Sequence, residues 1–194
     1  MNTTRDQILA ATCDLLENQG ASATGLSEII QESGAPKGSL YYYFPAGKEE
    51  IVSEAVRYAG RQVAERIRTA LAETPQAGQA VRLFIETIAG LVESSGYRSG
   101  GPLTSVAAET ATTSERVNQA CQEAYTWLRE AFQEKLVAEG RPPEEAERLA
   151  WGILAGIEGG TLLSRAFHTG EPLRLVARQL EELLASSSNP GRIG

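Results

Sequence analysis

Residues 24–48 read TGLSEIIQESGAPKGSLYYYFPAGK and predict two short helices joined by a tight turn. Leu26, Ile29 and Ile30 recur at the spacing that places apolar side chains on one face of a first helix. Gly34 follows at the position where a helix commonly ends in a left-handed residue. Two hydroxyl residues at the start are candidate caps for this helix, namely Thr24 and Ser27.

The second helix of this stretch has an unusual surface. Pro36 can open it, because a proline at the first helical position gives up no helical hydrogen bond. Leu40 and Phe44 lie one turn apart and are expected to face inward. The adjacent tyrosines 41–43 then cannot all be buried, and an exposed phenol can donate to a phosphate oxygen or pack on a thymine methyl. This combination is typical of a helix-turn-helix, whose second helix enters the major groove of DNA.

From the pattern alone, an ordinary αα-hairpin with surface tyrosines is an equal alternative. The stretch also resembles the TetR/AcrR family of bacterial transcriptional regulators, in which G-V-S-K-G-x-L-Y-x-H-F precedes K-E-E-L. Here GAPKGSLYYYF stands at residues 34–44 and KEEI at 48–51. Pro36 replaces the usual hydroxyl residue. The F-P-x-G-K form of the following loop, and a G-x-P-L-x-x-x-A-x-E pattern at residues 100–109, are similar to the LmrA/YxaF branch.

The resemblance implies a homodimeric, ligand-responsive DNA-binding regulator, and we expect a repressor that leaves a palindromic operator when a small effector binds. In a symmetric dimer, two helix-turn-helix domains match half-sites about one helical turn of DNA apart. We expect contacts near the bases from Lys37, Gly38, Ser39 and Tyr41. Contacts mostly to phosphate are expected from Thr24, Tyr42, Tyr43 and Lys48.

The whole chain sets limits on this interpretation. At 194 residues and 42% hydrophobic, it is long enough for one or two well-packed domains. No apolar run approaches the roughly 20 residues of a membrane span, and no signal peptide is apparent, so we expect a cytoplasmic protein. The net charge of −7 opposes DNA binding globally. Lys37, Lys48 and Arg5 nevertheless lie in the predicted DNA-binding part, which predicts a modest electrostatic contribution and a shallow salt dependence.

Enzymatic chemistry finds no support in the sequence. Cys13 and Cys121 lie far apart without a metal or redox motif, and the single His168 cannot build a histidine-based site. There is no nucleophile elbow, P-loop, dinucleotide fingerprint or metal-ligand spacing. We therefore expect no enzyme, metal or cofactor. The competing class is an all-helical adaptor that binds another protein through its tyrosine face, and only a test with duplex DNA separates the two.

Helical periodicity continues along the chain and predicts an all-α fold of about nine helices. Besides the two helices described above, the expected spans are 4–19, 48–72, 76–92, 103–109, 114–139, 144–167 and 172–185. We expect a three-helix helix-turn-helix domain at 1–48, a larger ligand-binding and dimerisation domain at 49–185, and a disordered tail at 186–194.

The last two predicted helices are strongly apolar. Glycines 152, 156, 159 and 160 are unfavourable inside a helix by roughly 1 kcal/mol each, unless another helix approaches closely. The two helices either complete a core within one chain or pair with the same helices of a second chain as a four-helix bundle. The resemblance implies the second arrangement.

The same family resemblance implies a small-molecule pocket in the larger domain. Bulky or polar-tipped residues on helices expected to face the interior are the candidates, although each is individually more typical of plain core. They are Phe84, Ile88, Tyr97, Cys121, Tyr125, Leu128, Phe132, Trp151 and His168. Because few polar groups lie on these faces, we expect a largely apolar or aromatic effector.

Overall fold

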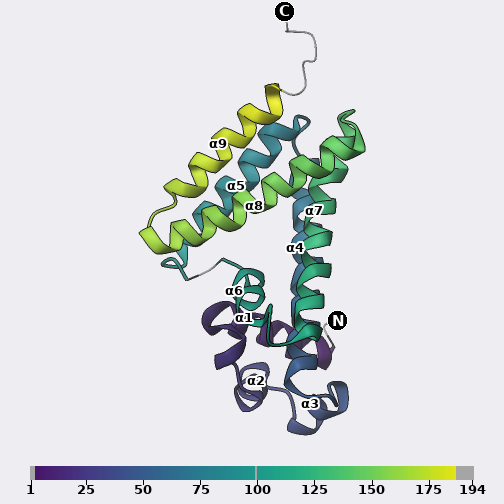
Figure 1. Ribbon diagram of the computed structural model, residues 1–194. Helices are drawn as coiled ribbons and strands as arrows, with labels where there is room; N and C mark the ends of the chain where they lie inside the picture. The colour runs from purple at the N-terminus through teal and green to yellow at the C-terminus, as the bar shows by residue number, and fades with distance from the viewer. Residues whose placement is uncertain (1–2, 99, 187–194) are drawn as a thin grey trace, which may run out of the picture. The chain divides into compact units, whose positions relative to one another are not determined.

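The computed structural model describes residues 3–98 and 100–186, and this part of the chain forms nine helices and no strand (Figure 1). The all-α prediction is therefore confirmed. The helices are α1 (Thr4–Ala23), α2 (Leu26–Ser33), α3 (Lys37–Tyr43), α4 (Lys48–Ala72), α5 (Ala77–Ser94), α6 (Pro102–Thr110), α7 (Glu115–Ala138), α8 (Pro143–Phe167) and α9 (Glu171–Ser186).

Helix α1 begins with a capping box and contains a break near its end. Thr3 accepts from the backbone of Asp6, and the Asp6 carboxylate accepts in return from the backbone N–H of Thr3. Gly20 was expected to end the helix, but the chain adds one more turn after it. Gly20 itself leaves helical geometry, with φ 78° and ψ 176°, a region that essentially only glycine occupies.

Helices α2 and α3 form the predicted helix-turn-helix. Gly34 ends α2 in the left-handed conformation, with φ 63°, as expected. Leu40 and Phe44 are both buried, which confirms that they face inward. Gly25 occupies the N-cap of α2 without a side-chain hydrogen bond, so neither hydroxyl residue proposed for that cap makes it. Pro36 is the N-cap of α3 rather than its first residue.

The chain divides into two compact units. The first comprises residues 1–62 and 101–127, and the second comprises residues 63–100 and 128–194. This division differs from the domain boundary expected at residue 48, because the first part of α4, helix α6 and the first part of α7 pack with the helix-turn-helix. In the first unit, α6 packs on α1.

The second unit is built around α5, α8 and α9, and α9 packs against both other helices (Figure 1). Two of the four unfavourable glycines of α8 allow this packing. A Cβ on Gly156 would lie 2.9 Å from Val176 Cγ1, and a Cβ on Gly160 would lie 2.9 Å from Leu173 Cδ2. The expected close approach is therefore found inside one chain at these two positions.

No helix among the described residues is long and apolar enough to cross a membrane. Helix α9 includes Ser186, so it ends one residue beyond the expected span. The rest of the predicted tail, residues 187–194, lies outside the described residues.

Candidate nucleic-acid interface

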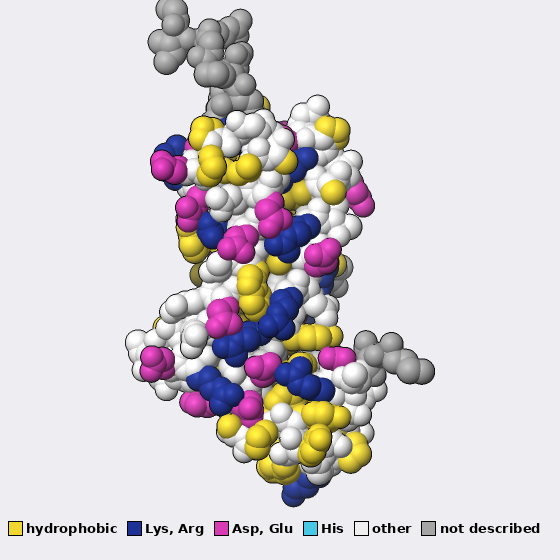
Figure 2. Space-filling view, turned by 90° about the vertical axis from the view of Figure 1, so that its right-hand side faces the viewer, with side chains coloured by type: hydrophobic (Ala, Val, Ile, Leu, Met, Phe, Trp, Pro, Cys, Tyr) yellow, Lys and Arg dark blue, Asp and Glu magenta, His cyan; other side chains and the backbone are white. Residues whose placement is uncertain are grey.

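Helix α3 presents an aromatic outer surface. Tyr42 is 79% exposed, Tyr41 is 48% exposed and Tyr43 is 37% exposed, although Leu40 and Phe44 on either side of the three are buried. The rings of Tyr42 and Tyr43 meet edge to face, with centroids 5.1 Å apart. Figure 2 shows hydrophobic side chains, a class that includes tyrosine, gathered toward its lower end, with a basic side chain at the bottom. This aromatic surface is available for a partner.

The first residues of α3 are also open. Lys37 and Gly38 are exposed, and Ser39 is half-buried. A Cβ on Gly38 would meet no atom within 4 Å, so nothing inside the chain requires glycine at this position. Glycine at this position would instead allow the backbone to approach an external partner closely.

Thr24 does not belong to this surface. Its side chain is fully buried, and its hydroxyl donates to the carbonyl oxygen of Gly20 at 2.7 Å. The helix break at Gly20 leaves that carbonyl in need of a donor, and the nearby threonine fills the role. A hydroxyl enclosed in this way cannot reach a phosphate, so we remove Thr24 from the proposed DNA contacts.

Lys48 has a structural contact in addition to its expected role. At the start of a helix a cation is disfavoured by the helix dipole. Here the Lys48 ammonium donates to the carbonyl oxygen of Ser22, at 3.2 Å, near the end of α1. This contact places a half-buried cation beside the helix-turn-helix, within the same compact unit.

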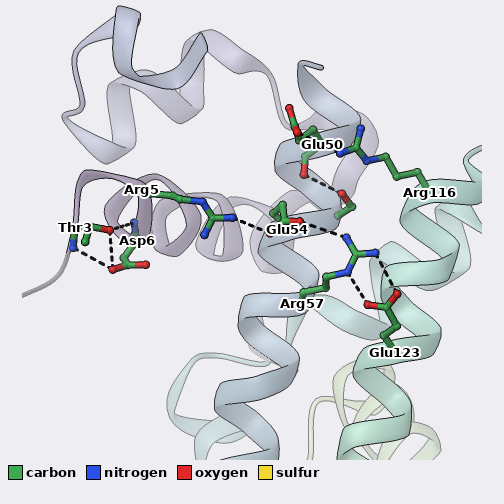
Figure 3. Close-up of polar contacts among 9 residues, drawn as sticks. Thr3, Arg5, Asp6, Glu50, Glu54, Arg57, Arg116 and Glu123 are labelled. Carbon is green, nitrogen blue, oxygen red and sulfur yellow. Dashed lines mark hydrogen bonds and ion pairs between the residues drawn. The ribbon is translucent and has the colours of Figure 1, made fainter. Parts of the chain in front are cut away.

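A chain of ion pairs joins α1, α4 and α7 within the first unit (Figure 3). Arg5 donates to Glu54 at 2.8 Å, and its guanidinium also lies 5.5 Å from the centre of the Phe44 ring. Arg57 lies 3.5 Å from Glu54 and donates to Glu123 at 2.6 Å and 3.3 Å. Arg5 therefore contacts Phe44 at the end of α3 while its own side chain is part-exposed.

Glu50 links the same helices to the loop after α3. Its carboxylate accepts from the backbone N–H of Ala46 at 2.7 Å. It also accepts from Arg116 of α7 at 3.3 Å (Figure 3). The K-E-E pattern at the start of α4 thus has a physical reason. The Glu50 carboxylate accepts from a backbone N–H in the loop next to α3 and also binds Arg116 of α7.

The Arg57–Glu123 pair predicts a loss of stability in acid. The hydrogen bond from Arg57 holds the pKa of Glu123 below its ordinary 4.5. A carboxyl whose folded pKa is depressed stabilises the protein above its unfolded pKa, and this stability is lost as pH falls through the folded pKa. We expect Arg57→Gln to lower the free energy of unfolding at pH 7 by about 0.5–1 kcal/mol, because solvent screens these partly exposed groups.

Urea unfolding at pH 7 and below pH 4 measures this effect. The difference between wild type and Arg57→Gln should shrink in acid. Arg66→Gln on the same helix is the control, because Arg66 is exposed and forms no ion pair with any of the described residues. A pH-independent difference would contradict the assignment to the Glu123 carboxylate.

Cys121 is buried and Cys13 is half-buried. Burial raises the pKa of Cys13 to about 12, and its thiol donates to the carbonyl oxygen of Ala55 at 3.3 Å. Burial also raises the pKa of Cys121 to about 11. Because the thiolate is the reactive form, neither residue is poised for redox chemistry at neutral pH.

The residues expected around a ligand fall into separate groups. Phe84 and Phe132 pack edge to face in the second unit, with centroids 5.9 Å apart, and Tyr97 stacks on His168 at 5.2 Å. Ile88 is half-buried and Leu128 is buried in the same unit, whereas Cys121 and Tyr125 belong to the first unit.

Two of those residues occupy a different place from the one expected. Trp151 is exposed, and the guanidinium of Arg129 lies 5.7 Å from the centre of its ring. His168 is exposed and caps α8 in the left-handed conformation. Helix α8 is apolar on its buried side and on its exposed side, so periodicity alone did not predict which side Trp151 occupies. We remove Trp151 and His168 from the proposed pocket because both side chains are exposed.

The fold and this surface define a class of protein. Three packed helices, α1 to α3, expose the lysine and tyrosine side chains of the short helix α3. This is the arrangement of a helix-turn-helix DNA-binding domain.

Comparison with known proteins identifies the family. Residues 8–55 match the model of bacterial regulatory proteins of the tetR family, and residues 77–179 match the C-terminal domain of LmrA/YxaF-like transcriptional regulators. The chain therefore belongs to the tetR family and, by its C-terminal domain, to the LmrA/YxaF-like group. It is a DNA-binding transcriptional regulator.

Individual relatives agree with this assignment. The uncharacterised HTH-type transcriptional regulator YxaF of Bacillus subtilis is 39% identical over 180 residues, covering 93% of this chain and 94% of the relative. The HTH-type transcriptional regulator LmrA of the same organism is 35% identical and covers 93% and 96%. A TetR transcriptional regulator from Chloroflexus aurantiacus has a solved structure that matches with a TM-score of 0.76 at 26% identity, covering 94% of each chain.

Proposed function

We propose that this protein is a homodimeric repressor that binds a palindromic operator and leaves it when a small apolar or aromatic effector binds. The observation that carries the proposal is the exposed surface of α3, where Lys37, Tyr41 and Tyr42 face outward beside a buried scaffold. Membership of the tetR family supports it.

The proposed DNA contacts follow from the positions on α3. Lys37, Gly38, Ser39 and Tyr41 lie near the bases, and Tyr42, Tyr43 and Lys48 contact mainly phosphate. Side chains at the start of a recognition helix are those that reach base edges in the major groove. A lysine ammonium can donate to guanine O6 or N7, and a tyrosine ring can pack on a thymine methyl.

A second copy of the chain would cover the outer face of α8 and α9. Large apolar side chains are exposed there, and these are Trp151, Leu162, Leu163, Phe167, Leu175 and Leu183. Large exposed apolar side chains on two helices that pack side by side are typical of an interface. Gly152 and Gly159 are exposed on the same side of α8 and meet nothing within 4 Å. A close approach of the partner's helices would account for glycine at these two positions, as α9 does for Gly156 and Gly160.

The effector would bind in the second unit near the apolar pair of Phe84 and Phe132, with Ile88, Leu128 and Tyr97 as further candidates. These side chains offer rings and aliphatic groups but no charge, which favours an apolar or aromatic molecule. The effector releases the operator only if it binds one conformation of the dimer more tightly than the other.

Selection of bound duplexes from a random-sequence pool tests the proposal. An inverted repeat with half-sites about one helical turn apart is the expected product. A folded protein that enriches no sequence at low salt would instead favour an adaptor that binds another protein.

The roles of two lysines can then be separated on the selected duplex. We expect Lys37→Ala to weaken binding about tenfold or more on the operator and to relax the choice of base at one position. Lys48→Ala, the same chemical change, should weaken all duplexes alike and reduce the slope of log affinity against log salt by about one. Fluorescence titrations with operator and scrambled duplexes measure both. A uniform effect of Lys37→Ala would rule out its contact with a base.

A further inference from the structure

The break in α1 leaves a backbone donor that another helix satisfies. After Gly20 leaves helical geometry, the following N–H groups lose their acceptors in the preceding turn. The N–H of Ser22 donates instead to the Glu109 carboxylate oxygen Oε2 at 2.8 Å. Glu109 lies on α6, far away in sequence but in the same compact unit. A single side chain of α6 thus completes the corner between α1 and α2.

The carboxylate is seated directly on the backbone at this corner. A Cβ on Gly20 would collide with Glu109 Oε1 and would come 2.9 Å from the carboxyl carbon. Only a residue without a side chain therefore permits this contact. Glycine at position 20 therefore allows both the unusual backbone angles and the close approach of Glu109.

The same corner holds a cation from the other side. The carbonyl oxygen of Ser22 accepts from the Lys48 ammonium at 3.2 Å. Ser22 is thus held through its N–H by α6 and through its C=O by the first residue of α4. Lys48 is also the residue that we assign to a phosphate, so the position of this corner affects where the cation lies.

A second contact fixes the opposite end of α6. The N–H of Gly101, which is the N-cap of α6, donates to Glu17 Oε1 of α1 at 3.1 Å. Helix α6 is therefore tied to α1 near both of its ends. It belongs to the stretch that matches the LmrA/YxaF-like C-terminal domain, whereas α1 largely belongs to the stretch that matches the tetR family model.

We propose that Glu109 is a positioning residue for DNA binding, which acts as the hydrogen-bond acceptor for Ser22 and so holds the α1–α2 corner and Lys48 in place. Glu109 itself does not touch the DNA. The proposal rests on the operator binding proposed above and names a contact through which α6 governs it.

Two substitutions separate the acceptor from its charge. Glu109→Gln removes the negative charge but keeps an acceptor oxygen at the same reach. Glu109→Asp keeps the charge but withdraws the acceptor by one methylene group. If geometry decides, Glu109→Asp weakens operator binding by up to about tenfold, in line with the loss of one hydrogen bond to a charged group, while Glu109→Gln stays close to wild type. If the charge alone decides, Glu109→Gln binds the operator more tightly than wild type and Glu109→Asp matches wild type, because removing an anion favours binding to DNA.

Titration of the selected operator with the full-length variants is the measurement, together with hydrogen exchange of the Ser22 amide. That amide should exchange faster in Glu109→Asp than in wild type or Glu109→Gln. Glu134→Asp and Glu134→Gln provide the matched control on α7, where the carboxylate accepts from Arg68 at 2.8 Å within the second unit. Neither control should change operator affinity.

The outcomes distinguish this proposal from the broader one. A Glu109→Asp protein with wild-type affinity, equal affinities of the two Glu109 variants, or weaker binding by the glutamine variant alone would each overturn the positioning role while leaving operator binding intact. If wild-type protein selects no duplex, the proposed function fails first. The exchange rate of Ser22 still tests the Glu109 contact in that case, and an unchanged rate in Glu109→Asp would overturn it.

Discussion

Leu162→Glu is expected to produce a monomer and to lower operator affinity by about two to four orders of magnitude. Leu162 is 59% exposed on the face of α8 that we assign to a second copy of the chain. A dimer places its second helix-turn-helix at the second half-site without a further bimolecular encounter, and the monomer loses this advantage. Two buried carboxylates facing each other across a symmetric interface would both be unpaired, which strongly disfavours the dimer.

The matched control is Leu91→Glu. Leu91 is 57% exposed on α5, outside the α8 and α9 face, so the substitution adds the same charge to an equally exposed leucine. Sedimentation velocity gives the mass of each variant, and titration with full and half operators gives the affinity. The wild type should prefer the full site, whereas the Leu162 variant should bind full and half sites nearly alike. A dimeric Leu162→Glu protein with wild-type affinity would place the interface elsewhere.

Local patterns were sufficient for the helices and for much of the helix-turn-helix. Leu40 and Phe44 face inward as their spacing predicts, and Gly34 ends α2 in the expected left-handed conformation. These features depend on residues within one or two turns of one another. A single sequence contains the information that they need.

Local sequence patterns did not predict the features that depend on residues far apart in the chain. Thr24 has the chemistry of a cap or a phosphate ligand, but the break at Gly20 provides a nearer acceptor for its hydroxyl. Gly152 and Gly156 look alike in the sequence, yet only Gly156 meets α9. The pairing of Glu109 with Ser22 spans 87 positions, and the motif that contains Glu109 gives no sign of its partner.

Gly20→Ala is expected to lower the free energy of unfolding by about 2–4 kcal/mol. A residue with a side chain at φ 78° and ψ 176° is disfavoured by about 1–3 kcal/mol, and a lost hydrogen bond adds about 1 kcal/mol. Gly34→Ala is the control, since Gly34 also has a positive φ but meets no atom within 4 Å. Gly34 has an ordinary left-handed conformation, so Gly34→Ala should lower the free energy of unfolding by only about 1–2 kcal/mol. Urea unfolding of the two variants compares these effects.

Combining Gly20→Ala with Glu109→Ala separates backbone strain from the lost contact. The new methyl group meets the end of a flexible side chain, so Glu109 can turn away, but in doing so it releases the N–H of Ser22. Once Glu109 has been shortened, Gly20→Ala should destabilise the protein only through its backbone angles. The destabilisations of the two single variants should therefore sum to about 1 kcal/mol more than the destabilisation of the double variant. Full additivity would mean that the carboxylate and Gly20 do not share this contact, and the stability effect of Gly20→Ala would then reflect its backbone conformation alone.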